Sequence, residues 1–189
     1  MSDIDKLLEA ARKHYERADL YRHLGQDSDS ITKAQVALDT AEDAMQALSH
    51  YEKAGIGSDI GEKYLRLYGF LEAIYLQQDA MAELHRIFVG KLAEPAASSA
   101  WSQLRDLRNL TAAHPIEKGL RNEPRKRTFI TQVSLESDGF DFQVWHQETS
   151  EISFERADLS ALYSAYKEEA AWILERIVAE LTVAPDFVP

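Results

Sequence analysis

Arg108, Asn109 and His114 bring a guanidinium, an amide and an imidazole together near the middle of the chain. A guanidinium can hold an anion through two parallel N–H groups, and a neutral imidazole can accept or return a proton near neutral pH. At no other place in the sequence do these three groups converge beside an expected helix end. The segment is therefore the candidate active or binding site.

The residues before and after this trio define the element that must position it. Apolar side chains recur at helical spacing from residue 101, and Pro115 disfavours helix at the residue before it, so a helix should end near His114. On a regular helix Arg108 and His114 would lie about 120° apart around the axis. They converge only if the helix loosens before Pro115, although pairing across a dimer would relax that requirement. The apolar positions are Trp101, Leu104, Leu107 and Leu110.

The segment Arg108 to His114 resembles the HEPN superfamily, helical-bundle domains marked by an arginine, four to six residues and a histidine. The spacing here is five residues, and Asn109 supplies the polar residue that often follows the arginine. Arg17 and His23 share the spacing, but Ala18 follows that arginine and its surroundings are acidic. The setting thus favours the Arg108 segment, and the resemblance is most convincing over residues 58–115.

This resemblance implies metal-independent RNA cleavage, or nucleotide binding without cleavage, at a site completed by a second copy of the chain. His114 would move the proton of a ribose 2′-hydroxyl, Arg108 would hold the phosphate, and Asn109 would orient the phosphate or the imidazole. It also implies a possible toxin or defence role with a protein antitoxin. Pro115 and Ile116 stand where one toxin subtype has a tyrosine modified by its antitoxin, so that mode of control is not expected.

Basic residues gather around the same segment in an otherwise acidic protein. The whole chain carries a formal net charge of −11, whereas residues 105–127 carry seven basic and three acidic side chains. Phosphate binding depends on clustered Lys and Arg, so these cations are candidates for the RNA backbone. An ordinary solvated loop is the alternative interpretation. The candidates are Arg105, Lys118, Arg121, Arg125, Lys126 and Arg127.

A second polar group lies on a helix expected from Ser58 to about Val89. Tyr68, Glu72, Tyr75 and Asp79 share one face of it, because they are three or four residues apart. Between Leu65 and Leu76 the helix is apolar nearly all round, which predicts burial. The four side chains therefore define a possible ligand pocket. Alternatively they are structural, with tyrosine hydroxyls satisfying the acids.

Periodicity along the chain predicts a mainly α fold, a bundle of about five helices in a single domain over residues 1–189. Helical patterns run from Ser2 to near Gly25, from Ser30 to Gly55, from Ser58 to Val89 with Gly69 as a kink or close contact, from Trp101 to His114, and from Asp158 to Leu181. Between the last two, about residues 128–154, the period changes to two. That change predicts an inserted β-hairpin or three-strand meander turning at residues 137–139.

Composition limits the classes of function. The chain has no cysteine, which excludes disulfides and thiolate chemistry, and its histidines have no zinc-ligand spacing, so no metal or cofactor is expected. An acidic start and the absence of a long apolar run predict a cytoplasmic protein with no membrane contact. Besides an endoribonuclease, two functions remain open: a dimerisation or protein-interaction module, and a small-ligand-binding bundle.

Overall fold

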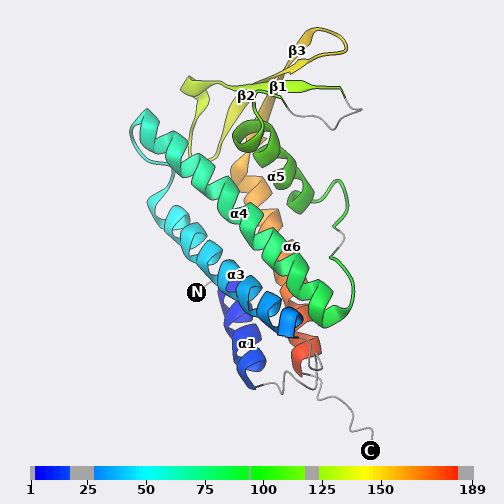
Figure 1. The fold of residues 1–189 in the computed structure, drawn as a ribbon. Coiled ribbons are helices and arrows are strands. Elements are labelled where there is room, and N and C mark those ends of the chain that lie inside the picture. Colours follow the sequence, from blue (N-terminus) through cyan, green and yellow to red (C-terminus); the bar gives the residue numbers. More distant parts are fainter. Residues whose placement is uncertain (1–2, 18–27, 94, 118–123, 183–189) are drawn as a thin grey trace, which may run out of the picture. The chain divides into compact units, whose positions relative to one another are not determined.

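The computed structural model describes residues 3–17, 28–93, 95–117 and 124–182. Five α-helices and one three-stranded sheet make up this described part, and the sheet lies between the fourth and fifth helices, so the predicted fold class is confirmed. The helices are α1 Asp3–Arg17, α3 Ser28–Ala54, α4 Ile60–Val89, α5 Ala100–Arg108 and α6 Leu159–Thr182 (Figure 1). The expected end of the first helix near Gly25, with His23, lies outside the described residues.

The chain divides into two compact units built from non-contiguous segments. One contains residues 1–46, 76–95 and 167–189, and the other contains residues 47–75 and 96–166. Helices α3, α4 and α6 each contribute residues to both units. The single domain expected from the sequence stays a prediction. Among the described helices, none is long and apolar enough to cross a membrane.

In the first unit, α1 packs on α3 through the apolar stripes expected from the sequence. The buried residues of these stripes include Leu8, Ala11, Ala34 and Ala41. Because alanine side chains are small, the two helices can approach each other closely. The Arg12 guanidinium joins the two helices, because its Nε lies 2.9 Å from a carboxylate oxygen of Glu42. That carboxylate is the main cause of the raised pKa of Arg12.

The second unit has an aromatic core that supports the candidate site. Tyr51 and Phe70 stack with their ring centroids 4.3 Å apart, and Phe70 meets Tyr163 edge-on at 5.0 Å. Trp101, on the predicted apolar stripe of α5, lies 5.7 Å from Tyr166 of α6. Burial of such large rings supplies much of the packing energy of a unit this size.

The three strands form an antiparallel meander in the order β1-β2-β3. They are β1 Lys126–Ile130, β2 Gly139–His146 and β3 Glu151–Asp158. The alternation after Ile130 suggested a first strand reaching Leu135, which is wrong, because a 3₁₀ turn occupies Gln132–Ser134. The predicted turn is present, and it is closed by hydrogen bonds between Glu136 and Gly139.

One expectation for α4 was wrong, and of the two alternatives at Gly69 the close contact is absent while the kink stays a prediction. Leu65 and Leu76 are exposed, so the helix is not buried all round, although Leu67, Leu71 and Ile74 are fully buried. Gly69 makes no close contact, since a Cβ added there would have no neighbour within 4 Å. An apolar run cannot by itself separate a buried face from a face that is exposed in a single chain. The exposed apolar side of α4 therefore needs its own explanation.

Candidate phosphate-binding site at the end of α5

Helix α5 presents two arginines along one flank of its buried stripe. The helix begins at a cap in which the Ser99 hydroxyl accepts a hydrogen bond from the Ser102 amide at 3.1 Å. Its residues Trp101, Leu104 and Leu107 are buried, which directs Arg105 and Arg108, three positions apart, toward α4. The cap and the buried stripe hold the helix in place, so they fix the backbone positions from which the Arg105 and Arg108 side chains extend.

The Arg108 guanidinium is held by Glu72 of α4. Its Nε donates to Oε2 of Glu72 at 2.9 Å, and its Nη2 lies 2.8 Å from the same oxygen. The Arg108 side chain is only 17% exposed, against 46% for Glu72. Sequence spacing gave no sign of this pair, because its members are 36 residues apart on different helices.

Tyr75 lies beneath both arginines. The guanidinium carbon of Arg108 is 4.1 Å from the centre of the tyrosine ring, and that of Arg105 is 4.5 Å away. A cation over an aromatic face is attracted by the ring's electron density, and the attraction strengthens where water is excluded. Arg108 is therefore fixed by charge on one edge and by stacking on one face.

The four residues of the predicted polar face of α4 lie in different environments. Glu72 is satisfied by Arg108 rather than by a tyrosine hydroxyl, and Tyr75 is covered by the two arginines. Tyr68 is exposed on one side, although burial of its other side raises the pKa of its phenol, as does the neighbouring Tyr64. Asp79 is exposed and belongs to the other unit. A ligand pocket lined by all four residues stays a prediction.

Asn109 contacts the arginine that precedes it. Its Oδ1 accepts a hydrogen bond from Nη1 of Arg108 at 3.1 Å, so the amide orients the guanidinium, whereas orientation of a phosphate or of the imidazole by Asn109 stays a prediction. A guanidinium carries five N–H donors, and the contacts to Glu72 and Asn109 engage three nitrogen positions without using every donor. The remaining N–H groups are available to an anion.

The helix loosens immediately after Arg108. Residues Asn109–Ala113 form a π-helical turn, in which the His114 amide donates to the Asn109 carbonyl at 3.0 Å. Such turns, with hydrogen bonds five residues apart, are rare and frequent at functional sites. His114 leaves the helix with φ −134° and ψ 47° just before Pro115, as predicted. The loosening that would let Arg108 and His114 approach each other is therefore present.

The His114 side chain is exposed. Within the described ranges, no residue makes a hydrogen bond or an ion pair with its imidazole. No contact joins it to Arg108 within one chain either, so the two groups are neighbours along the turn rather than bonded partners. The imidazole of His114 is therefore accessible to an incoming ligand.

The chain after His114 is attached to the sheet. The Thr128 amide of β1 donates to the Pro115 carbonyl at 2.8 Å, which binds the exit of the π-turn to the outer edge of that strand. Arg127 and Lys126 come directly before Thr128 in the same strand. The predicted basic segment and the predicted catalytic segment thus meet through backbone contact.

The other predicted cations differ in their partners. Arg125 pairs with Glu117 at 2.8 Å, and Arg127 lies over the Trp145 ring with its guanidinium carbon 4.6 Å from the centre. Lys118 and Arg121 lie outside the described residues. Both Arg125 and Arg127 are exposed. The charge of Arg125, however, is partly neutralised by the carboxylate of Glu117.

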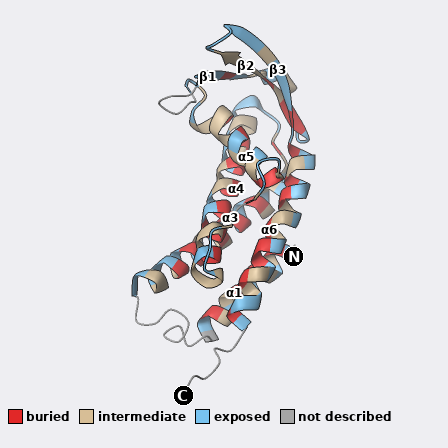
Figure 2. Cartoon of the chain, turned by 90° about the vertical axis from the view of Figure 1, so that its right-hand side faces the viewer, coloured by how far each residue is buried: buried red, intermediate tan, exposed pale blue. Residues whose placement is uncertain are grey.

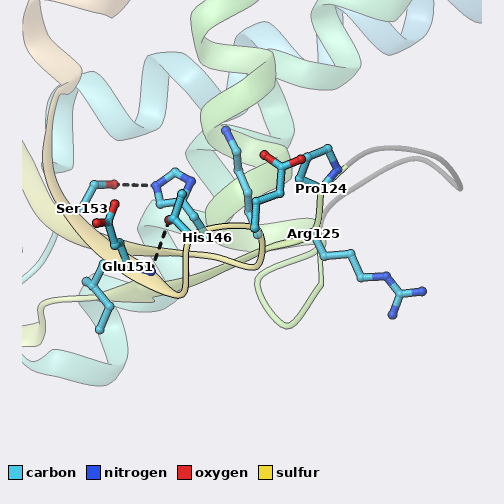
Figure 3. Close-up of a pocket in the computed structure, with 9 residues that line it drawn as sticks. Pro124, Arg125, His146, Glu151 and Ser153 are labelled. Carbon is cyan, nitrogen blue, oxygen red and sulfur yellow. Dashed lines mark hydrogen bonds between the residues drawn. The ribbon is translucent and has the colours of Figure 1, made fainter.

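A hollow of about 340 Å³ lies where β2 turns into β3 (Figure 3). His146 and Ser153 face each other across it, with His146 Nε2 2.9 Å from the serine hydroxyl, and Ser153 donates to Glu155 at 3.1 Å. Arg125 points away from this pair in Figure 3. Spacing along the sequence does not reveal this pair, because strand register brings His146 to Ser153.

Comparisons with known proteins add no relative. No family model matches the chain, and neither a curated protein nor a solved structure is similar to it. Among the described residues, no three His, Asp or Glu side chains gather as metal ligands would. The site is therefore interpreted from its own geometry.

A double-mutant cycle tests the Arg108–Glu72 pair. Combining Arg108→Met with Glu72→Gln should reveal a coupling of about 0.5 to 1 kcal/mol in the free energy of unfolding, the upper range for partly exposed pairs. Urea denaturation measures it. The matched control is the more exposed pair Arg125–Glu117, for which Arg125→Met with Glu117→Gln should give a coupling near zero. Equal couplings in the two cycles would contradict the proposed rigidity of Arg108.

Proposed function

We propose that this protein binds RNA at Arg108, Asn109 and His114 and cleaves it without a metal ion, in the manner of HEPN domains. One observation carries the proposal: a guanidinium fixed on three sides, with N–H groups to spare, lies one π-helical turn from a solvent-facing imidazole. Fixed positive charge and a nearby proton acceptor are the two requirements of phosphodiester transfer within RNA.

The cleavage step uses the ribose itself as the nucleophile. Neutral His114 accepts the proton of the 2′-hydroxyl, and the 2′-oxygen bonds to the adjacent phosphorus. The bond from phosphorus to the 5′-oxygen breaks, leaving a 2′,3′-cyclic phosphate, and the departing oxygen takes a proton from an imidazolium. The second imidazole is His114 of another copy of the chain. No oxidant, reductant or metal ion is needed for the step to balance.

Arg108 stabilises the charge that accumulates on the phosphate oxygens. Glu72 and Tyr75 hold its guanidinium before RNA arrives, so little reorganisation is needed during the reaction. Glu72 also reduces the net charge of the group, which limits ground-state binding to the phosphate. Arg108 is thus a catalytic residue in this proposal, and Glu72 is a positioning residue.

Cleavage of RNA in the presence of a chelator tests the proposal. Arg108→Ala and His114→Ala should each lower the rate by at least about a hundredfold, the usual contribution of one such group. Arg108→Lys should also be impaired, because an ammonium cannot contact Glu72, Asn109 and phosphate in the same planar arrangement. The products, resolved by mass spectrometry, should carry cyclic phosphate ends.

The matched control is His50→Ala, which removes an exposed histidine of α3 and should leave cleavage unchanged. Thermal unfolding of every variant excludes loss of fold as the cause. If Arg108→Ala and His114→Ala cleave RNA as fast as the unaltered protein, the enzymatic proposal is wrong.

A protein-interaction module is the second candidate, and the exposed side of α4 favours it. Leu65 is 74% exposed, and the ring of Tyr68 beside it is tilted against that of Tyr64, with centroids 5.8 Å apart. Large exposed apolar groups on one helix face mark contact surfaces. Glu72 follows one turn after Tyr68, so a second copy of the chain, or a protein antitoxin, bound there would adjoin Arg108. The same surface therefore serves either candidate.

Leu65→Glu tests whether that surface joins two copies. A charge at the centre of an apolar contact is costly to bury, so the variant should be monomeric where the unaltered protein is a dimer. Light scattering coupled to size exclusion measures the mass. Val133→Glu, at another exposed apolar position, is the control and should not change it. If the unaltered protein is a monomer and still cleaves RNA, a site shared between two copies of the chain is ruled out.

A further inference from the structure

One face of the three-stranded sheet carries an exposed apolar surface. Residues opposite one another in an antiparallel sheet point to the same side, and on this face two adjacent rows lie beside the ion pair of Asp141 and Arg156. The first row is Phe129, Gln143 and Phe154, and the second is Arg127, Trp145 and Ile152. These six residues are called the sheet platform. The opposite face holds Phe140, Phe142 and Val144, all buried, so the platform is the face that the unit leaves uncovered.

The platform is unusually apolar for a face in contact with water. Phe154 is 78% exposed and Phe129 is 56% exposed, and the exposed colour covers most of β3 (Figure 2). Antiparallel sheets usually place polar side chains on their solvated face. Exposed aromatic rings gathered in this way mark a binding surface.

The chemistry of the platform fits the bases of unpaired nucleic acid. Every base has a flat π-face, and aromatic side chains on a sheet stack such faces when the bases are not paired with each other. Neighbouring strands are about 4.8 Å apart, so Phe129 and Phe154, separated by one strand, are about 10 Å apart. That spacing leaves room for separate bases, with the Gln143 amide between them to hydrogen-bond a base edge.

The charge beside the platform favours a phosphate chain over a second copy of this protein. Arg127 lies on Trp145 without a carboxylate partner among the described residues, whereas Arg156, the other arginine on this face, is paired with Asp141. Two copies meeting through this face would bring their Arg127 side chains into one interface, at a cost in like-charge repulsion. An RNA backbone instead supplies the opposite charge.

The platform also leads to the candidate site. Thr128 lies between Arg127 and Phe129, and its amide is bonded to the Pro115 carbonyl, the residue after His114. A strand of RNA crossing from β3 to β1 therefore reaches the edge of the sheet to which Pro115, the residue after His114, is bonded. We infer that the sheet platform binds single-stranded RNA by stacking its bases and delivers the adjoining phosphate to Arg108 and His114. The delivery rests on the proposed function, whereas the stacking does not.

Binding of a fluorescein-labelled, unstructured RNA 12-mer, followed by anisotropy, tests the platform. The oligonucleotide carries 2′-O-methyl groups so that it cannot be cleaved. Phe154→Ala should weaken binding at least about fivefold, the lower end of the effect of losing one base stack. Phe154→Trp should keep the affinity, whereas Phe154→Leu, apolar but without a π-face, should behave as Phe154→Ala. Val133→Ala is the control and should bind as the unaltered protein does.

Salt and competitor experiments sharpen the result. Arg127→Ala should reduce the slope of log affinity against log salt by about 0.7, the value for one phosphate contact on a single strand. A duplex of the same sequence should bind much more weakly, because its bases are already stacked. Equal affinity for the duplex, or unchanged affinity in Phe154→Ala and Phe154→Leu, would overturn the inference. The inference would also be overturned if the protein does not bind the RNA and instead forms a dimer that Phe154→Ala dissociates.

Cleavage assays separate this inference from the proposed function. At saturating cleavable RNA, Phe154→Ala should cut at the normal rate, with its defect confined to KM, whereas His114→Ala should keep the Phe154-dependent part of its binding to the 12-mer and not cut. Binding that depends on Phe154 in a protein without ribonuclease activity would uphold the platform and reject the proposed function. Cleavage that depends on His114 but never on Phe154 would uphold the proposed function and reject the platform.

Discussion

The ion pair between Arg108 and Glu72 is the interaction on which the candidate site depends. It joins α5 to α4, and it fixes a guanidinium that would otherwise sample many rotamers. Tyr75 adds a stacked surface below the same group, and Asn109 holds its remaining edge. Because α5 ends at Arg108 and the π-turn begins there, the pair also sets where His114 emerges.

Local sequence signals predicted most of the elements that surround this pair. The stripe from Trp101 to Leu107 and the break before Pro115 are decided within one helix, so spacing was enough to predict them. The meander was predicted for the same reason, because alternation is a property of each strand. Its first strand was drawn too long, since the alternation continued into a turn that Ser134 closes by bonding to the Asp141 amide at 2.8 Å.

The connections between elements were not predictable from spacing. Glu72 and Tyr75 were assigned to a ligand pocket and Arg108 to a separate motif, yet the structure brings them together. The sheet platform was missed because the period of two in β1 and β3 shows alternation without showing which side packs on the helices. The apolar side of α4 was taken as buried for the same reason. Each of these depends on tertiary packing, which one segment does not encode.

The central claim is that Arg108 and His114 engage the same phosphate group. The most direct measurement is an NMR titration of the protein with an uncleavable 2′-O-methyl RNA, following the Arg108 Nε–H signal and the His114 imidazole signals. Both should shift together and saturate at one RNA concentration, while the signals of the exposed His50 stay in place. If RNA saturates the protein and the Arg108 and His114 signals do not move, the account of this site is wrong.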